Sequence, residues 1–71
     1  MTQHEISVAM MHEHLRNNIT ELGKTRRVVE SATPEGPEET LLKVDALQKI
    51  DQSIAIVHAI IEVVDQHAKD R

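Results

Sequence analysis

Apolar residues in the N-terminal half recur at steps of three and four, and this spacing places them on one face of a helix. Thr2 and Glu5 stand at the spacing of a capping box, in which each side chain satisfies the backbone N–H of the other residue. The pattern predicts a helix over about residues 3–31, with Gly23 off its apolar face. That face consists of Val8, Met11, Leu15, Ile19, Leu22 and Val29.

A break in the pattern separates this helix from a second one. Both prolines and one of the two glycines lie in the break. Pro34 disfavours a helical conformation at the residue before it, and Gly36 permits a turn. Pro37 suits the first position of a helix, where its missing N–H costs nothing, and two glutamates follow it near the positive end of the helix dipole. We expect a turn over 32–36 and a second helix over about 37–69.

The second helix carries a regular heptad seam, that is, a line of apolar residues at alternating steps of three and four. Because a short connection joins antiparallel neighbours, the two apolar faces are expected to pack together. The chain is thus predicted to be all-α: one antiparallel, coiled-coil-like helical hairpin over residues 1–71. The seam consists of Leu47, Ile50, Ile54, Val57, Ile61, Val64 and Ala68. The expected hairpin core is Leu15, Leu22, Leu47, Ile54, Val57 and Ile61.

The second helix also has apolar residues roughly opposite its seam, interrupted by Lys49 and Ser53. The stretch is too short to span a membrane, which needs roughly 20 mostly apolar residues. In so small a chain, a second apolar side is expected to contact another molecule. Two uses remain open, namely a different protein partner and a second copy in a four-helix bundle. The expected partner-binding residues are Leu42, Ile56, Ile60 and Val63. On the first helix, the residues off the apolar face are Ile6, Met10 and Val28.

Composition narrows the function classes. Chains below roughly 70–80 residues rarely build a sufficient core alone, and this one has 71 residues. It has no cysteine, which excludes a disulfide and is compatible with a reducing cytoplasm. The N-terminus lacks the pattern of a secretory signal, so we expect a cytoplasmic protein. A net charge of −4 and the absence of aromatic residues disfavour nucleic-acid binding.

Neither a metal site nor an active site is expected. His58 and Glu62 stand four residues apart and could chelate, but a site needs three or four ligands. We expect these two residues to form a solvated polar wedge with Asp51 and Asp65. There is no cysteine nucleophile and no glycine-rich phosphate loop, which indicates a protein that is not an enzyme and uses no cofactor. The other histidines are expected to be solvent-exposed, namely His4, His12, His14 and His67.

Basic residues on the first helix keep a second function open. Arg16, Lys24 and Arg27 fall on one side, whereas Arg26 lies nearer the apolar face. Small acidic hairpin dimers such as the plasmid copy-number regulator Rop bind RNA through a strip of this kind. The alternative is therefore a homodimeric four-helix bundle that serves as a regulatory or RNA-binding adaptor.

Residues 46–58 read ALQKIDQSIAIVH. This run resembles the C-terminal helix of the E-component co-chaperones of type III secretion needle proteins, the YscE/EscE-type family. Members of that family are helical hairpins of similar length.

The resemblance implies a function in the bacterial cytosol. In that family the E component binds and stabilises a larger, tetratricopeptide-like chaperone. The larger chaperone holds the needle subunit and keeps it unpolymerised before export. By this resemblance, the chain is expected to be a small co-chaperone.

Overall fold

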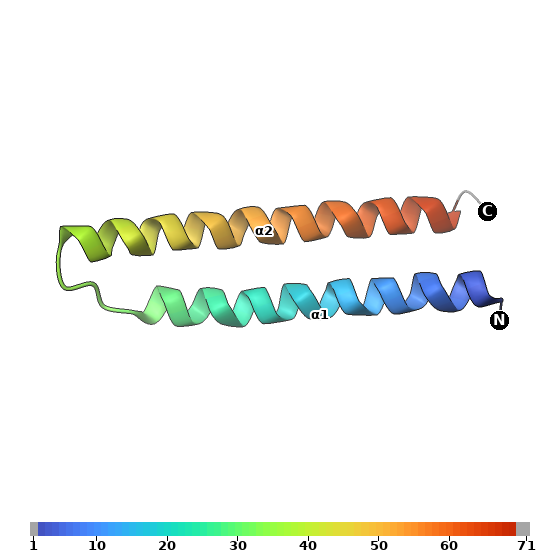
Figure 1. Cartoon of the computed structure of the whole chain (residues 1–71), viewed down its shortest axis with the longest axis horizontal. Coiled ribbons are helices and arrows are strands. Elements are labelled where there is room, and N and C mark those ends of the chain that lie inside the picture. Colours follow the sequence, from blue (N-terminus) through green and yellow to red (C-terminus); the bar gives the residue numbers. More distant parts are fainter. Residues whose placement is uncertain (1, 70–71) are drawn as a thin grey trace.

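The computed structural model describes residues 2–69 and consists of two long antiparallel α-helices (Figure 1). Helix α1 spans Gln3–Ser31 and α2 spans Pro37–Lys69. The predicted all-α hairpin is confirmed. The molecule measures 55 × 16 × 11 Å, so it is a single layer of two helices. We call the end that holds the connection the turn end, and the end that holds Gln3 and Lys69 the open end.

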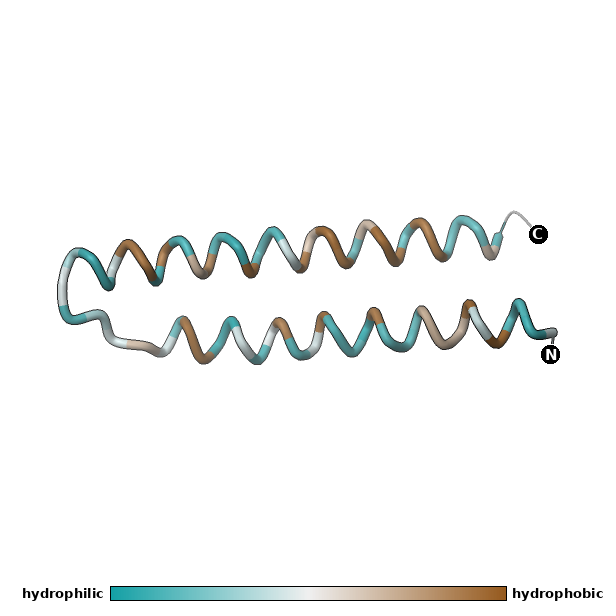
Figure 2. The backbone as a smooth tube through the Cα atoms, in the orientation of Figure 1, coloured by the Kyte–Doolittle hydropathy of each residue, from teal (hydrophilic) through white to brown (hydrophobic). Residues whose placement is uncertain are grey.

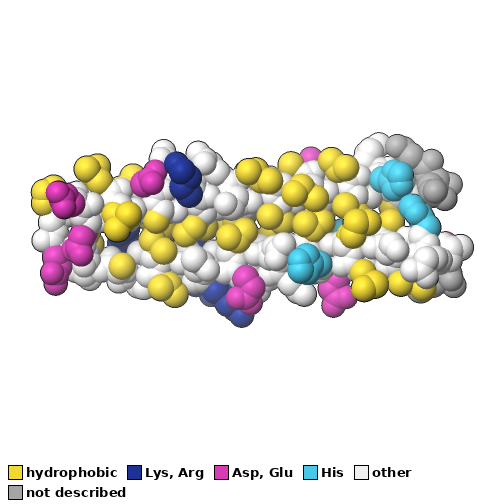
Figure 3. Space-filling model, viewed as in Figure 1, with side chains coloured by type: hydrophobic (Ala, Val, Ile, Leu, Met, Phe, Trp, Pro, Cys, Tyr) yellow, Lys and Arg dark blue, Asp and Glu magenta, His cyan; other side chains and the backbone are white. Residues whose placement is uncertain are grey.

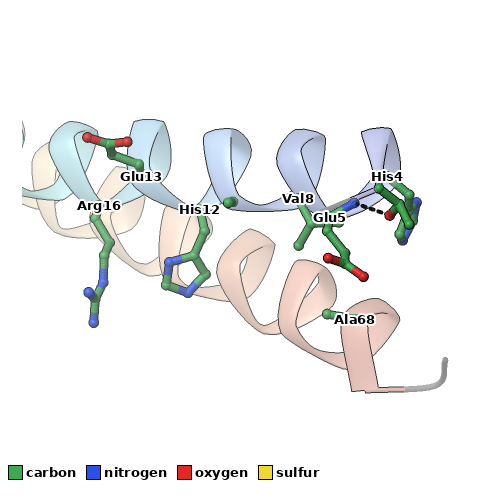
Figure 4. A pocket seen from close by; sticks show the side chains of 9 residues that line it. His4, Glu5, Val8, His12, Glu13, Arg16 and Ala68 are labelled. Carbon is green, nitrogen blue, oxygen red and sulfur yellow. Dashed lines mark hydrogen bonds between the residues drawn. The ribbon is translucent and has the colours of Figure 1, made fainter.

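The first helix is capped at Thr2, where one of the two bonds of the predicted capping box is formed, whereas the Glu5 side chain reaches toward α2 (Figure 4). The backbone N–H of Glu5 donates to Thr2 Oγ1 at 3.2 Å, and the N–H of Ile6 donates to the Thr2 carbonyl at 3.1 Å. Two of the donors that a helix start leaves free are thereby satisfied. At the other end, Ala32 is extended, and its N–H donates to the Val29 carbonyl at 3.2 Å.

The second helix begins at Pro37, as the sequence predicts. Gly36 caps it, because its carbonyl accepts from the N–H of Thr40 at 3.0 Å and from the hydroxyl of Thr40 at 2.9 Å. The Glu39 carboxylate accepts from the N–H of Glu35 at 2.6 Å. This bond ties the turn to the first turn of α2, so the connection is held by side-chain capping rather than by a glycine at positive φ.

Lys43 joins the two helices at the turn end. Its Nζ donates to the carbonyl of Glu30 at 2.6 Å and to that of Ala32 at 2.8 Å. The last turn of α1 has no basic residue of its own, so α2 supplies the cation that complements the negative end of α1. Nothing in the local sequence of α1 indicates this cap.

The two apolar faces meet along the whole hairpin, and hydrophobic positions recur along both helices (Figure 2). All six residues expected in the hairpin core are half-buried. No residue within the described range 2–69 is fully buried. Each helix has only one neighbour, so every side chain in the contact keeps an edge open to solvent. The half-buried apolar residues are Val8, Leu15, Ile19, Leu22, Val29, Pro34, Ala46, Leu47, Ile50, Ile54, Val57, Ile61 and Val64.

Three expectations about the helix contact were wrong. Met11 is 48% exposed, and His12 is half-buried in its place. The α1 contact follows a heptad in which His12, Ile19 and Arg26 stand seven residues apart, and a count of apolar residues alone misses its polar members. Gly23 is half-buried rather than off the contact. Ala68 is exposed, because the seam ends before the last turn of α2.

Replacement of Lys43 by Met tests the cross-helix cap. The aliphatic stem remains, whereas the bonds to the α1 carbonyls and the charge near the dipole are lost. We expect the free energy of unfolding to fall by about 1–2 kcal/mol, measured by urea unfolding followed by circular dichroism at one protein concentration.

The matched control is Lys49→Met. Lys49 is exposed and pairs only within its own helix, with Asp45 at 3.3 Å. Lys49→Met should lower the free energy of unfolding by clearly less than Lys43→Met does. Equal losses for the two variants would contradict the cap.

Candidate functional site

The hairpin has two unlike faces, and the first carries the polar contacts between the helices. His12 Nε2 lies 3.1 Å from Asp65 Oδ1. Arg26 donates to Asp51 along one edge of its guanidinium: Nε to Oδ1 is 2.7 Å and Nη2 to Oδ2 is 3.4 Å. The two pairs stand two heptads apart on each helix, so one register satisfies both. We call this side the polar face.

The Arg26–Asp51 pair is held in its charged form. The hydrogen bond from Arg26, together with its positive charge, lowers the pKa of the Asp51 carboxyl. The same bond and the charge of Asp51 raise the pKa of Arg26. Glu30, one turn further along α1, also binds Arg26. Arg26 is thus a cation shared by two carboxylates, and one of them belongs to the other helix.

The polar wedge expected on α2 is exposed at all four residues, and two of them, Asp51 and Asp65, also pair with α1. His4 and His12 were expected in solvent and are half-buried. The signal that could have found these contacts is the spacing, because the two partners on each helix are separated by two heptads.

The second side of the hairpin is apolar, and we call it the apolar face (Figure 3). The α2 residues predicted to bind a partner are exposed. Leu42 is 69% exposed, Ile56 is 60%, Ile60 is 43% and Val63 is 68%. By helical geometry these four lie on the opposite side of the α2 seam from Asp51.

Residues of α1 extend the same face. At the turn end, Val28 and Leu42 line one groove with Val29, Ala46 and Lys43. Val28 and Met10 share one side of α1, so Met10 lies along the face toward the open end. These residues of the two helices therefore share one surface, whereas Leu41 and Val44 are exposed outside it. This shared surface depends on how the two helices are rotated against each other, which the sequence pattern of one helix does not show.

The middle of the apolar face is polar. Ser53 and Asn18 are half-buried there, and Lys49 pairs with Asp45 at 3.3 Å. The face therefore has an apolar patch at the turn end and a larger one toward the open end. Figure 3 shows apolar side chains along the junction of the helices and outer ones toward both ends.

A shallow hollow at the open end is the other concave region (Figure 4). Glu5 and His12 reach from α1 toward α2, whereas Glu13 points away. The rings of His4 and His67 lie 5.4 Å apart at this end. Within residues 2–69 no group of three His, Cys, Asp or Glu residues is arranged to hold a metal ion.

The basic residues of α1 are scattered rather than gathered in a patch. Lys24 donates to Glu21 at 3.3 Å, one turn before it. Arg16 borders the open-end hollow, and Arg27 is exposed nearer the turn end. Pairing with neighbouring acids, which is the ordinary role of such residues on a helix, is therefore seen for Lys24.

No family model matches the chain, and no curated protein or solved structure is significantly similar to it. Among the residues described, neither helix is long and apolar enough to cross a membrane. Function is therefore inferred from the apolar face itself.

The Arg26–Asp51 pair should make stability depend on pH. The pKa of Asp51 is lower in the folded chain than in the unfolded one. Ionised Asp51 therefore stabilises the fold fully above the ordinary aspartate pKa range, and this stabilisation is lost as pH falls through the lowered pKa. Asp51→Asn should thus be less stable than the native chain at neutral pH, and the two unfolding curves should converge in strong acid. Thermal unfolding at a series of pH values measures this difference.

Asp45→Asn is the control for this comparison, because Asp45 pairs only with Lys49 of its own helix. Its effect at neutral pH should be smaller. A difference for Asp51→Asn that stays constant down to strong acid would show that the pair does not stabilise the fold through its charge.

Proposed function

We propose that the chain is a co-chaperone that binds a larger helical chaperone through its apolar face. One observation carries this proposal: exposed apolar residues from both helices, among them Val28, Leu42 and Ile56, share one side of a chain with no fully buried residue in its described range. Full burial of one exposed Ile or Val contributes about 1.5–3 kcal/mol. Several such residues together supply enough free energy for a stable complex.

The shape of the face favours a helical partner. Ile56, Ile60 and Val63 stand at steps of four and three, which is the spacing of side chains that a helix inserts into a groove. Helices of a repeat protein present such grooves, and their ridges accept aliphatic side chains. The lack of aromatic residues on this chain suits packing of that kind.

The identity of the partner follows from the resemblance of residues 46–58. It supports a tetratricopeptide-like chaperone of a type III secretion system as the bound protein. In this proposal the hairpin stabilises that chaperone in the cytoplasm, and the chaperone keeps the needle subunit unpolymerised. The hairpin acts by covering surface and has no catalytic role.

An RNA-binding adaptor is less well supported. Lys24 is neutralised by Glu21, and Arg26 is engaged by Asp51 and Glu30. Of the basic residues of α1 considered for RNA binding, this leaves Arg16 and Arg27, and the chain as a whole has a net charge of −4. Phosphate binding needs several cations along one surface, and its affinity falls steeply with salt.

The double variant Ile56→Ser/Ile60→Ser tests the proposed docking face. It should abolish co-purification of a helical-repeat chaperone and a small needle-type subunit when the tagged chain is isolated from its native host. The helical circular dichroism signal should be largely kept, since both residues are exposed. The native complex should survive high salt, because apolar burial provides its affinity.

A closely matched comparison uses two valines of α2. Val63 lies on the apolar face and is 68% exposed, whereas Val44 is 54% exposed and lies toward the polar side of the helix. Val63→Ser should weaken capture and Val44→Ser should not. Equal effects, or recovery of RNA in place of a chaperone, would overturn the proposal.

A further inference from the structure

The isolated hairpin exposes more surface than a stable monomer of its mass. Its accessible area is 5666 Å². A compact monomer of this size exposes roughly 4,400 Å², so the excess is about 1,200 Å². A stable protein interface needs about 800 Å² from each partner. The chain therefore has enough surplus area for one full interface.

We propose that the free chain is an antiparallel homodimer, in which two apolar faces pack together as a four-helix bundle with the turns at opposite ends. The proposal concerns the chain on its own and does not depend on the co-chaperone function. A different partner would occupy the same face in place of the second copy.

The polar face is the poorer choice for this contact. Arg26 and Asp51 already satisfy each other across the helices there. Burial of that pair under another molecule would remove both charges from water, which costs several kcal/mol for each ion before any new contact is gained. On the apolar face such a penalty arises only in the middle, where Lys49 pairs with Asp45 of its own helix.

The order of residues along α2 favours the antiparallel arrangement. In a dimer with opposed turns, α2 packs on α2 of the other copy, and Ser53 lies near the two-fold axis because it is the middle residue of the helix. Ile60 then faces the small Ala46, and Leu42 faces Val64. By the same pairing Ser53 meets Ser53 of the other copy, whereas Val63 faces Lys43 and Lys49 faces Val57.

The arrangement with both turns together is less favourable. Each α2 would then pack on α1 of the other copy. The register of the hairpin, in which Val28 lies beside Leu42 and His4 beside His67, places Ile56 at the level of His14 of α1 and Ile60 at the level of Met10. Ile56 would then be covered by a polar side chain.

The charges at the two ends of the hairpin also favour opposed turns. The turn end carries Glu35, Glu38 and Glu39, whereas the last turn of α2 carries His67 and Lys69. Figure 3 shows acidic side chains at the turn end of this face and histidines toward the open end. Opposed turns bring unlike charges together, whereas aligned turns bring the glutamates of two copies together. Such pairs are weak individually, but they discriminate between two orientations of one face.

The molar mass of the purified full-length chain tests the dimer. Light scattering coupled to size exclusion should give twice the chain mass of 8.0 kDa. Ile56→Ser/Ile60→Ser should shift the mass to that of a single chain, and Val44→Ser should leave the dimer intact. A native chain that stays monomeric at millimolar concentration, or dissociation by Val44→Ser alone, would overturn the proposal.

A distance measurement tests the orientation. The chain has no cysteine, so Leu42→Cys can be spin-labelled at a single site. Opposed turns place the two labels about 33 Å apart, from the helix rise of 1.5 Å per residue. Aligned turns place them about 10–15 Å apart, one or two helix diameters. A short distance by pulsed electron resonance would overturn the antiparallel arrangement.

The two proposals fail separately. A monomeric chain that still captures the helical-repeat chaperone would leave the co-chaperone function standing and overturn the dimer. A chain that dimerises but captures no such chaperone would leave the dimer standing and overturn the co-chaperone function.

Discussion

Two helices in a single layer cannot enclose a fully buried core, and the other features of this protein depend on that constraint. Each helix has one neighbour, so even the residues at the centre of the contact are only half-buried. A third or fourth helix normally closes such a contact from the side. Here the open side of the seam continues into an apolar face, so the helix contact and the proposed binding surface are continuous.

Because the seam alone is incomplete, polar contacts set the geometry of the hairpin. The Arg26–Asp51 and His12–Asp65 pairs share one register, and a slip of one helix past the other would break both. Lys43 connects the C-terminal end of α1 to α2. These contacts lie on the polar side or at the turn, where they leave the apolar face free. Directional polar bonds specify the register of the two helices, whereas the apolar area stays uncovered and available to a second molecule.

The same surface accounts for both proposed complexes. Aliphatic side chains at helical spacing bind other helices with little regard for their exact sequence, since dispersion and burial are not directional. A second copy of the chain and a helical-repeat chaperone are therefore competitors for one face. In these two proposals, the dimer covers the apolar face of the free chain until a partner that buries more area replaces the second copy.

The sequence by itself determined the helices, their caps, the heptad seam and the membership of the α2 stripe. These features depend on residues three to seven positions apart, and the helical period relates such residues without any tertiary information. Only the tertiary structure decided that Arg26 pairs with Asp51 and His12 with Asp65, that Lys43 caps the other helix, and that Val28 shares a face with Leu42. Those relations join residues far apart in the chain. They follow from the rotation and register of one helix against the other, which no local pattern specifies.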